Sequence, residues 1–378
     1  MRAHDMTRVN RRKFLTASTA GLGAISLAGL AGCGGARGAA ASTVSTGGQL
    51  ADAVLEALTT HRLVGIGEAE GLQNHHDALQ ALITDPRVPE VVNDIVVEFG
   101  NARYQNTIDR FIAGHPVHNA ELRQVWRNTT QSPLNTWDPP VYEQFYRTVR
   151  AANWALPAAK QMRVLLGDPP IDWSKIRNLS QLRGFGSQRD THAASVVKKE
   201  VLANGRRALL CYGWGHLAHG GSLVGLLERQ TNERVYTIVD LVTLAGDPGG
   251  VAKNLAAYPR NSVIPTKGTW LGGLDAGLMP PSLHGGLHTA ATNPWCGTRL
   301  GTLIDAGLYE GQPSELTASW PNPAIYLDPS YWAELRRRNA LHGNVVDLDA
   351  YRKEQPIVFG LQALPRSQEC GTSKSNVR

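Results

Sequence analysis

Cysteine is scarce in this chain, which has four among 378 residues. That number excludes a disulfide-dense secreted scaffold. Cys211 lies in an apolar run at 208–212 and is predicted to be a small buried hydrophobe. Cys296 and Cys370 lie in irregular polar surroundings, where a disulfide between them is compatible with an oxidising compartment. Spacing alone does not establish that pairing.

Several catalytic signatures are also missing. The chain has no Gly-x-Ser-x-Gly turn, so a serine hydrolase of the α/β-hydrolase type is unsupported. It has no His-Glu-x-x-His sequence, and neither Gly-x-Gly-x-x-Gly nor a Walker sequence follows the first predicted strand. A metalloprotease helix of that kind and a nucleotide-binding loop are therefore unsupported.

Positive charge is sparse outside the N-terminal segment. The formal net charge of the whole chain is +6. Residues 1–32 carry five basic side chains and one acidic side chain, a net of +4, so only +2 remains for residues 33–378. This balance gives no reason to expect a nucleic-acid partner.

The N-terminal segment has the pattern of an export signal. Residues 10–16 read Asn-Arg-Arg-Lys-Phe-Leu-Thr, a twin-arginine motif, and an apolar stretch leads to Leu-Ala-Gly-Cys at 30–33. The end of this segment resembles a bacterial lipoprotein box, in which the thiol of Cys33 would be lipidated. A single membrane anchor is the alternative, but the apolar stretch is shorter than the ~20 residues that a span needs. We therefore expect the twin-arginine export machinery as a partner and lipid anchoring to the bacterial cell envelope, outside the cytoplasm.

The remaining chain divides by composition. Residues 33–48 are rich in Gly, Ala, Ser and Thr and are predicted to be a flexible tether. Residues 49–365 are long enough for one large α/β domain. Residues 245–301 are rich in Gly and Pro, with no confident strand or long helix, which is typical of a lid or insertion. Residues 366–378 are predicted to be a disordered tail.

Within the domain, short apolar runs alternate with segments of helical spacing. The runs lie at 63–66, 95–97, 164–166, 208–212 and 235–241, and the helical segments include 74–82, 141–154, 190–203, 222–229 and 331–338. Continuous apolar strands separated by helices predict a mostly parallel central sheet flanked by helices, in a single domain.

A polar, glycine-containing turn follows each of the first four predicted strands. These turns are Gly67-Glu-Ala-Glu-Gly71, Glu98-Phe-Gly-Asn101, Gly167-Asp-Pro-Pro170 and Gly213-Trp-Gly-His216. Because ligands bind at the carboxyl ends of the strands in open α/β sheets, we expect the turns to converge on one acidic, histidine-containing cleft.

Each candidate residue also has a structural interpretation. Glu68 could cap the following helix, and Glu98 could pair with Arg103 or Arg110. Glu70 could be an exposed loop residue, and His75 and His76 more often face solvent or pack against a helix than bind a ligand. His219 is ambiguous. His284 and His288 have metal-compatible spacing only if they are helical, which the glycines between them disfavour.

These turns resemble those of the superfamily that contains erythromycin esterases, TraB/Tiki proteins and haem-binding ChaN proteins. The resemblance covers most of residues 60–340, in order, and residues 303–309 carry it together with these turns. The family is marked by two Gly-x-x-His turns and a strand-end glutamate. Gly213–His216 matches the second turn and Glu98 matches the glutamate, whereas Glu70 stands where the first histidine is expected.

The resemblance implies several kinds of chemistry. Tiki-type members imply a divalent metal, for which Glu70, Glu98 and His216 would be the ligands, a set that suits Mn or Fe better than Zn. Erythromycin esterases imply metal-free water activation, with Glu70 or His216 as the base and Glu68 or Glu98 orienting it. ChaN-like members imply haem or iron binding.

These observations lead to one principal prediction and two alternatives. The chain is predicted to be an exported hydrolase of an ester or amide bond in a small molecule or peptide, with Glu68, Glu98 and His216 as the catalytic centre. Asn101, Arg103 and Asp168 are predicted to surround it and contact a cofactor. The first alternative is a non-enzymatic haem- or metal-binding lipoprotein. The second is a surface interaction protein, for which several tryptophans in loop-rich segments are suited.

Overall fold

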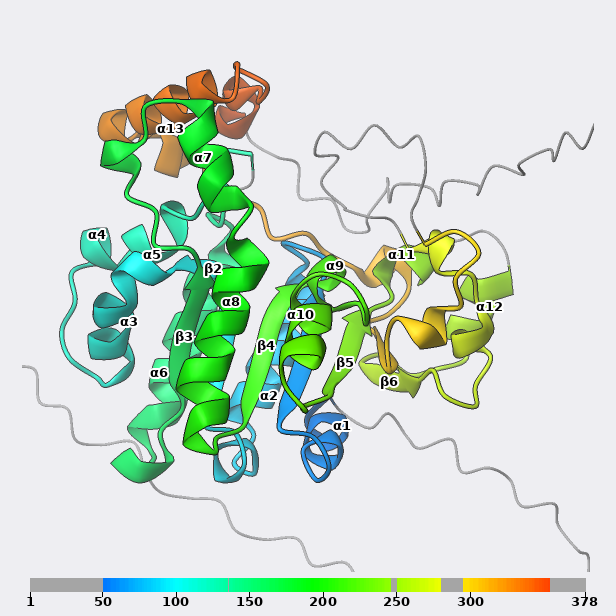
Figure 1. The fold of residues 1–378 in the computed structure, drawn as a ribbon. Coiled ribbons are helices and arrows are strands. Elements are labelled where there is room, and N and C mark those ends of the chain that lie inside the picture. Colours follow the sequence, from blue (N-terminus) through cyan, green and yellow to red (C-terminus); the bar gives the residue numbers. More distant parts are fainter. Residues whose placement is uncertain (1–49, 135, 246–249, 280–294, 354–378) are drawn as a thin grey trace, which may run out of the picture. The chain divides into compact units, whose positions relative to one another are not determined.

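The α/β prediction is confirmed by a seven-stranded sheet (Figure 1). The computed structural model describes residues 50–134, 136–245, 250–279 and 295–353. Strand order is β3-β2-β4-β1-β5-β7-β6, and the strands are parallel except for β6, which is antiparallel to β7. The strands are β1 (Leu63–Glu68), β2 (Asp94–Asn101), β3 (Arg163–Asp168), β4 (Ala208–Gly213), β5 (Val235–Asp240), β6 (Ser262–Pro265) and β7 (Ala306–Tyr309).

Helices connect and cover the strands. The longer ones are α1 (Leu50–Ala57), α2 (Gln73–Thr84), α3 (Gln105–Ile112), α6 (Pro140–Trp154), α7 (Leu179–Gly186), α8 (Arg189–Val196), α10 (Leu223–Gln230) and α13 (Pro329–Leu341). The short ones are α4 (Asn119–Leu122), α5 (Gln124–Arg127), α9 (Trp214–Leu217), α11 (Val242–Ala245) and α12 (Gly250–Leu255). Within residues 245–301, where no strand was predicted, β6 forms an edge of the sheet.

The pleat of the strands divides the core into two layers. Val64 and Ile66 of β1 pack with α1, α2 and α6, whereas Leu63 packs with α8 and α10 on the opposite face. Figure 1 shows α8 and α10 in front of the sheet and α2 behind it. Successive side chains of a strand point to opposite faces, so continuous apolar strands are buried on both sides.

The same alternation sorts the polar side chains at the strand ends. Glu68 and Asp240 continue the face of Ile66 and Ile238, which is covered by α2 and α6. Glu98 continues the face of Val96, which is covered by α8. The strand ends therefore present ionisable groups to both faces of the sheet, and Glu70 lies close enough to Glu68 and Glu98 for both charges to act on it.

Several predictions concern residues outside the described ranges. These are the signal at 1–32, Cys33, the tether at 33–48, the tail at 366–378, and His284 and His288. Cys296 is described and is disulfide-bonded. Cys370 lies outside the described residues, so the pairing of these two cysteines stays a prediction. No helix within the described ranges is long and apolar enough to cross a bilayer.

Candidate functional site

Three of the predicted residues meet around Gly213, the last residue of β4. The Gly213 amide donates to Glu98 Oε2 at 2.7 Å. A Cβ placed on Gly213 would lie 3.3 Å from both Glu70 Oε1 and Glu98 Oε2, and 3.9 Å from His216 Cδ2. Glycine at this position therefore leaves the space in which the two carboxyl groups and the imidazole approach one another.

Arg189, the first residue of α8, completes this group and was missed by the sequence analysis. Its Nη2 contacts Glu98 Oε1, and its Nε lies 3.9 Å from Asp168 Oδ1. The partner of Glu98 is therefore Arg189 and neither Arg103 nor Arg110, which pair with Asp172 and Glu121. No sequence signal marked Arg189, because only the fold brings the start of α8 to the end of β2.

His216, in the short helix α9, is held between two carboxylates. Its Nδ1 lies 2.6 Å from Asp190 Oδ1, and its Nε2 lies 3.4 Å from Glu98 Oε1. Burial alone would lower the pKa of His216, but the Glu98 charge and the hydrogen bond to Asp190 outweigh it and raise the pKa to about 9. The imidazole is therefore a cation at neutral pH. Its side chain remains 22% exposed, so solvent reaches this group.

The two carboxyl groups beside Gly213 titrate in different ranges. Burial, together with the charges of Glu98 and Glu68, raises the pKa of Glu70 to about 8. Burial would also raise the pKa of Glu98, but His216 and Arg189 lower it to about 2. Neighbouring acids whose environments separate their pKa values in this way are typical of acid–base sites.

Glu68 lies on the opposite side of the sheet from Glu98. Its Oε2 accepts hydrogen bonds from His76 Nε2 at 3.0 Å and from the Tyr142 hydroxyl at 3.2 Å, and the residue is 2% exposed. The N-cap residue of α2 is Leu72, whose side chain makes no capping hydrogen bond, and the hydrogen bonds of Glu68 Oε2 go to side chains and not to the first backbone amides of that helix. Glu68 influences the group at Gly213 through its charge, which contributes to the raised pKa of Glu70.

The three predicted cofactor residues occupy different surroundings. Asp168 accepts a hydrogen bond from the Thr130 amide at 2.8 Å and lies beside Arg189; burial raises its pKa to about 7, against the Thr130 hydrogen bonds that lower it. The buried Asn101 donates its amide to backbone carbonyls at 128 and 171, which ties two loops together. Arg103 pairs with Asp172 at 3.1 Å and is half exposed. Their contact with a cofactor stays a prediction.

A second ionisable group lies on the α2 face and was also missed. His75 Nδ1 lies 2.7 Å from Asp240 Oδ1 and 4.0 Å from Glu310 Oε1. Asp240 ends β5 and Glu310 follows β7 directly. Ligands bind at the carboxyl ends of parallel strands, and this principle pointed to Glu68 and Glu98. Applied to the ends of β5 and β7 as well, it would have pointed to Asp240 and Glu310.

The metal implied by the family resemblance does not fit the residues around Glu98. The Arg189 guanidinium contacts Glu98 Oε1 and lies 3.5 Å from His216 Nε2, so a cation bound there would face a like charge. His216 is also poorly placed to bind haem iron, because its Nδ1 contacts Asp190 and its Nε2 faces the Arg189 guanidinium. In the described part of the chain, the three side chains whose ligand atoms all lie within 4.8 Å of one another are His75, Asp240 and Glu310.

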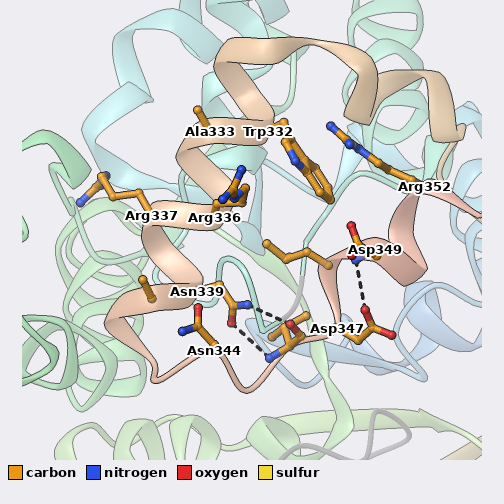
Figure 2. A pocket seen from close by; sticks show the side chains of 12 residues that line it. Trp332, Ala333, Arg336, Arg337, Asn339, Asn344, Asp347, Asp349 and Arg352 are labelled. Atoms are coloured by element: carbon orange, nitrogen blue, oxygen red, sulfur yellow. Dashed lines mark hydrogen bonds between the residues drawn. The ribbon is translucent and has the colours of Figure 1, made fainter.

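A separate pocket of about 810 Å³ lies at α13 and the segment that follows it. Figure 2 shows Asn339 joined to the backbone at 346 by two hydrogen bonds, which are 2.8 and 3.1 Å long. The Arg352 guanidinium carbon lies 3.6 Å from the centre of the Trp332 ring. The lining carries both acidic and basic side chains and shares no residue with the group at Gly213.

Comparison with known proteins gives distant likenesses only. No protein-family model and no curated protein sequence matches the chain. Similar solved structures include ChaN of Campylobacter jejuni with cofacially bound haem, which is 15% identical, covers 50% of this chain and 85% of its own, and has a TM-score of 0.32. The type III effector HopBA1 is 14% identical, covers 53% and 86%, and has a TM-score of 0.34. A Bacillus cereus protein is 10% identical, covers 50% and 67%, and has a TM-score of 0.32. Likenesses this distant carry no argument about function.

Proposed function

We propose that this chain is an exported, lipid-anchored hydrolase that activates water to cleave an ester or amide bond in a small molecule or peptide. The observation that carries the proposal is the meeting of Glu70, Glu98 and His216 around Gly213, beside Arg189, with His216 open to solvent. Export and anchoring rest on the pattern of residues 1–33.

Glu70 is the residue best suited to accept a proton from water. Its pKa of about 8 lies closer to neutral pH than that of an ordinary carboxyl group, and a general base is most effective when its pKa lies near the working pH. The water oxygen bonds to the carbonyl carbon, its proton passes to Glu70, and the carbonyl electron pair moves onto the oxygen. Glu70 thereby takes the role that the sequence analysis left open between Glu70 and His216.

Arg189 and His216 supply positive charge for the oxyanion that forms in this step. Fixed cations and N–H donors directed at a developing oxyanion lower the barrier of acyl transfer. The protonated imidazole can then donate its proton to the leaving oxygen or nitrogen, whose bond to carbon breaks. Glu98 and Asp190 act as positioning residues, because they hold the guanidinium and the imidazole in place.

The proposal is tested by comparing two histidine variants of the full-length chain on a panel of ester and amide substrates. His216→Ala should abolish turnover while the protein stays folded by circular dichroism. His219→Ala is the matched control, since His219 also lies between two carboxylates, Glu228 and Asp305, at 3.1 and 2.8 Å, but outside the group at Gly213. Unchanged turnover in His216→Ala would overturn the assignment.

The second candidate function is a non-enzymatic haem- or metal-binding lipoprotein, and a different observation favours its metal-binding form. The closely spaced His75, Asp240 and Glu310 offer one nitrogen and two carboxylate ligands. This candidate predicts that the purified protein retains a cofactor and hydrolyses none of the substrates in the panel.

A further inference from the structure

His75, Asp240 and Glu310 form a closed cluster on the α2 face of the sheet. His75 belongs to α2, Asp240 is the last residue of β5, and Glu310 comes directly after β7. Their exposed fractions are 1%, 3% and 1%. Three separate elements therefore bring their ionisable side chains to one place that solvent does not reach.

The orientation of these side chains is set by contacts around them. Asp240 Oδ2 accepts the Ala69 amide at 2.8 Å, which turns Oδ1 toward His75 Nδ1 at 2.7 Å. Glu310 Oε1 lies 4.0 Å from the same nitrogen. Ligand atoms about 2.1 Å from one metal ion lie roughly 3 to 3.4 Å from one another. The cluster thus approaches the spacing of a ligand set: around an ion, the His75–Asp240 distance would lengthen slightly and the His75–Glu310 distance would shorten.

Glu310 supplies a second observation. Neither of its carboxyl oxygens accepts a hydrogen bond from an N–H group or a hydroxyl of the described residues, although both are buried, and the carboxyl group is hydrogen-bonded to the carboxyl group of Asp240 instead. Two buried carboxyl groups that face each other are costly unless a proton or a cation lies between them. Nearby, Glu68 Oε1 and His76 Nδ1 are buried and also lack a partner in the described chain. A cation would satisfy the Glu310 oxygens.

We propose that His75, Asp240 and Glu310 bind one divalent first-row transition-metal ion. One imidazole nitrogen and two carboxylate oxygens suit Mn²⁺, Fe²⁺ or Zn²⁺, and the two carboxylates balance the charge of the ion. Because the cluster is closed to solvent, the ion has a structural role: it joins α2 to the ends of β5 and β7. This inference does not depend on the proposed hydrolase.

Glu310→Gln is the variant that tests the site. Glutamine has the shape of glutamate and can donate a hydrogen bond to Asp240, so the variant keeps the packing while losing a ligand and its charge. Glu228→Gln is the matched control, because Glu228 belongs to a comparable histidine–carboxylate cluster with His219 and Asp305 that is more exposed. Glu70→Gln controls for an ion bound at Gly213 instead.

The experiment incubates the full-length chain, purified without chelators, with Mn²⁺ or Zn²⁺ and then measures bound metal by mass spectrometry and the Tm by calorimetry. Wild type, Glu228→Gln and Glu70→Gln should each hold about one ion per chain, and Glu310→Gln should hold roughly tenfold less. The ion should raise the Tm of wild type by at least about 3 °C and leave the Tm of Glu310→Gln unchanged.

Two outcomes would overturn the proposal. Wild type that stays metal-free with an unchanged Tm would mean that Asp240 and Glu310 share a proton instead of an ion. An ion that survives Glu310→Gln but is lost in Glu70→Gln would lie at Gly213. Hydrolysis is not a readout here, so failure of the hydrolase proposal would leave this test intact.

Discussion

At the scale of single residues, Glu70 and His216 make activity dependent on pH in a defined window. Glu70 must be ionised to accept a proton, so kcat/KM should rise as pH passes about 8. His216 must be protonated to stabilise the oxyanion, so kcat/KM should fall as pH passes about 9. The pH profile of ester hydrolysis is therefore expected to be bell-shaped, with its maximum between about pH 8 and 9. Because the charges of Glu70 and His216 act on each other, the two limbs report the pKa values of the pair and not of either residue alone.

Glu70→Gln tests which residue produces the rising limb. The variant should lose roughly 100-fold or more of kcat/KM, the range in which general bases contribute. A wild-type profile that rises between pH 4 and 5 would show instead that an ordinary carboxylate is the base.

Arg189 and Glu98 form a coupled pair whose removal should affect stability. Arg189→Met leaves the buried Glu98 charge with only His216 as a cationic neighbour, so the free energy of unfolding should fall by about 2 kcal/mol, below the 3 to 5 kcal/mol of a fully buried pair. The double variant Arg189→Met/Glu98→Gln should lose less than the sum of the two single losses. Urea denaturation of the four proteins measures the coupling, and additive losses would show that the contact contributes nothing to stability.

At the scale of elements, the approach of β3 to the Tyr212 side chain predicts a specific steric effect. A Cβ at Gly167 would lie 1.8 Å from the Tyr212 hydroxyl oxygen and 3.0 Å from its Cζ. Gly167→Ala should therefore destabilise the domain by about 1 to 3 kcal/mol, the usual cost of overpacking. Thermal unfolding measures the loss.

Tyr212→Phe provides the rescue for that variant. The Tyr212 hydroxyl is buried without a hydrogen-bond partner in the described chain, so its removal alone should cost little. Because the hydroxyl is the nearest clashing atom, Gly167→Ala/Tyr212→Phe should recover part of the loss. A double variant as unstable as Gly167→Ala alone would show that the clash lies elsewhere.

The major elements could be predicted from the sequence because their patterns are local. The apolar runs at 63–66 and 208–212 lie within β1 and β4, whose continuous burial reflects a sheet covered on both faces. The strand β6 could not be predicted, because it has four residues and is defined by antiparallel pairing with β7, about 40 residues away. Pairing over such a distance leaves no signal in a short window of sequence.

The candidate site was only partly predictable for a related reason. Strand ends marked Glu70, Glu98 and His216 because the carboxyl edge of a parallel sheet is a fixed location. Neither Arg189 nor Asp190 follows a strand, so their approach depends on how α8 packs. Whether a side chain at a strand end faces α2 or α8 follows from counting along the strand, because successive side chains point to opposite faces. The prediction of one shared cleft did not take this alternation into account.

At the scale of the whole molecule, the ionisable groups predict an unusually acidic optimum of stability. The pKa values of Glu70, Asp168 and His216 are raised to about 8, 7 and 9. The folded state therefore holds more protons than the unfolded state from about pH 4 to 9, and its stability falls as pH rises across that range. The pKa of Glu98, lowered to about 2, gives the opposite slope below about pH 4.5.

These slopes place the maximum stability of the domain near pH 5. Calorimetric Tm measurements from pH 3 to 10 would check this expectation. Asp168→Asn should flatten the decline between about pH 4 and 7, since it removes one of the groups responsible. A Tm that peaks near pH 8 would contradict the assigned directions.

The alternation of side chains along the strands has a consequence for how such a protein can change. Residues one position apart at a strand end pack into separate interiors, so a substitution on the α8 side that keeps the charge leaves the packing of the α2 side in place. Libraries that randomise only the uncharged α8-facing positions could therefore redirect substrate preference while the opposite interior continues to stabilise the scaffold. One sheet edge thus offers two compartments whose packing selection can alter separately, with charge as the link between them.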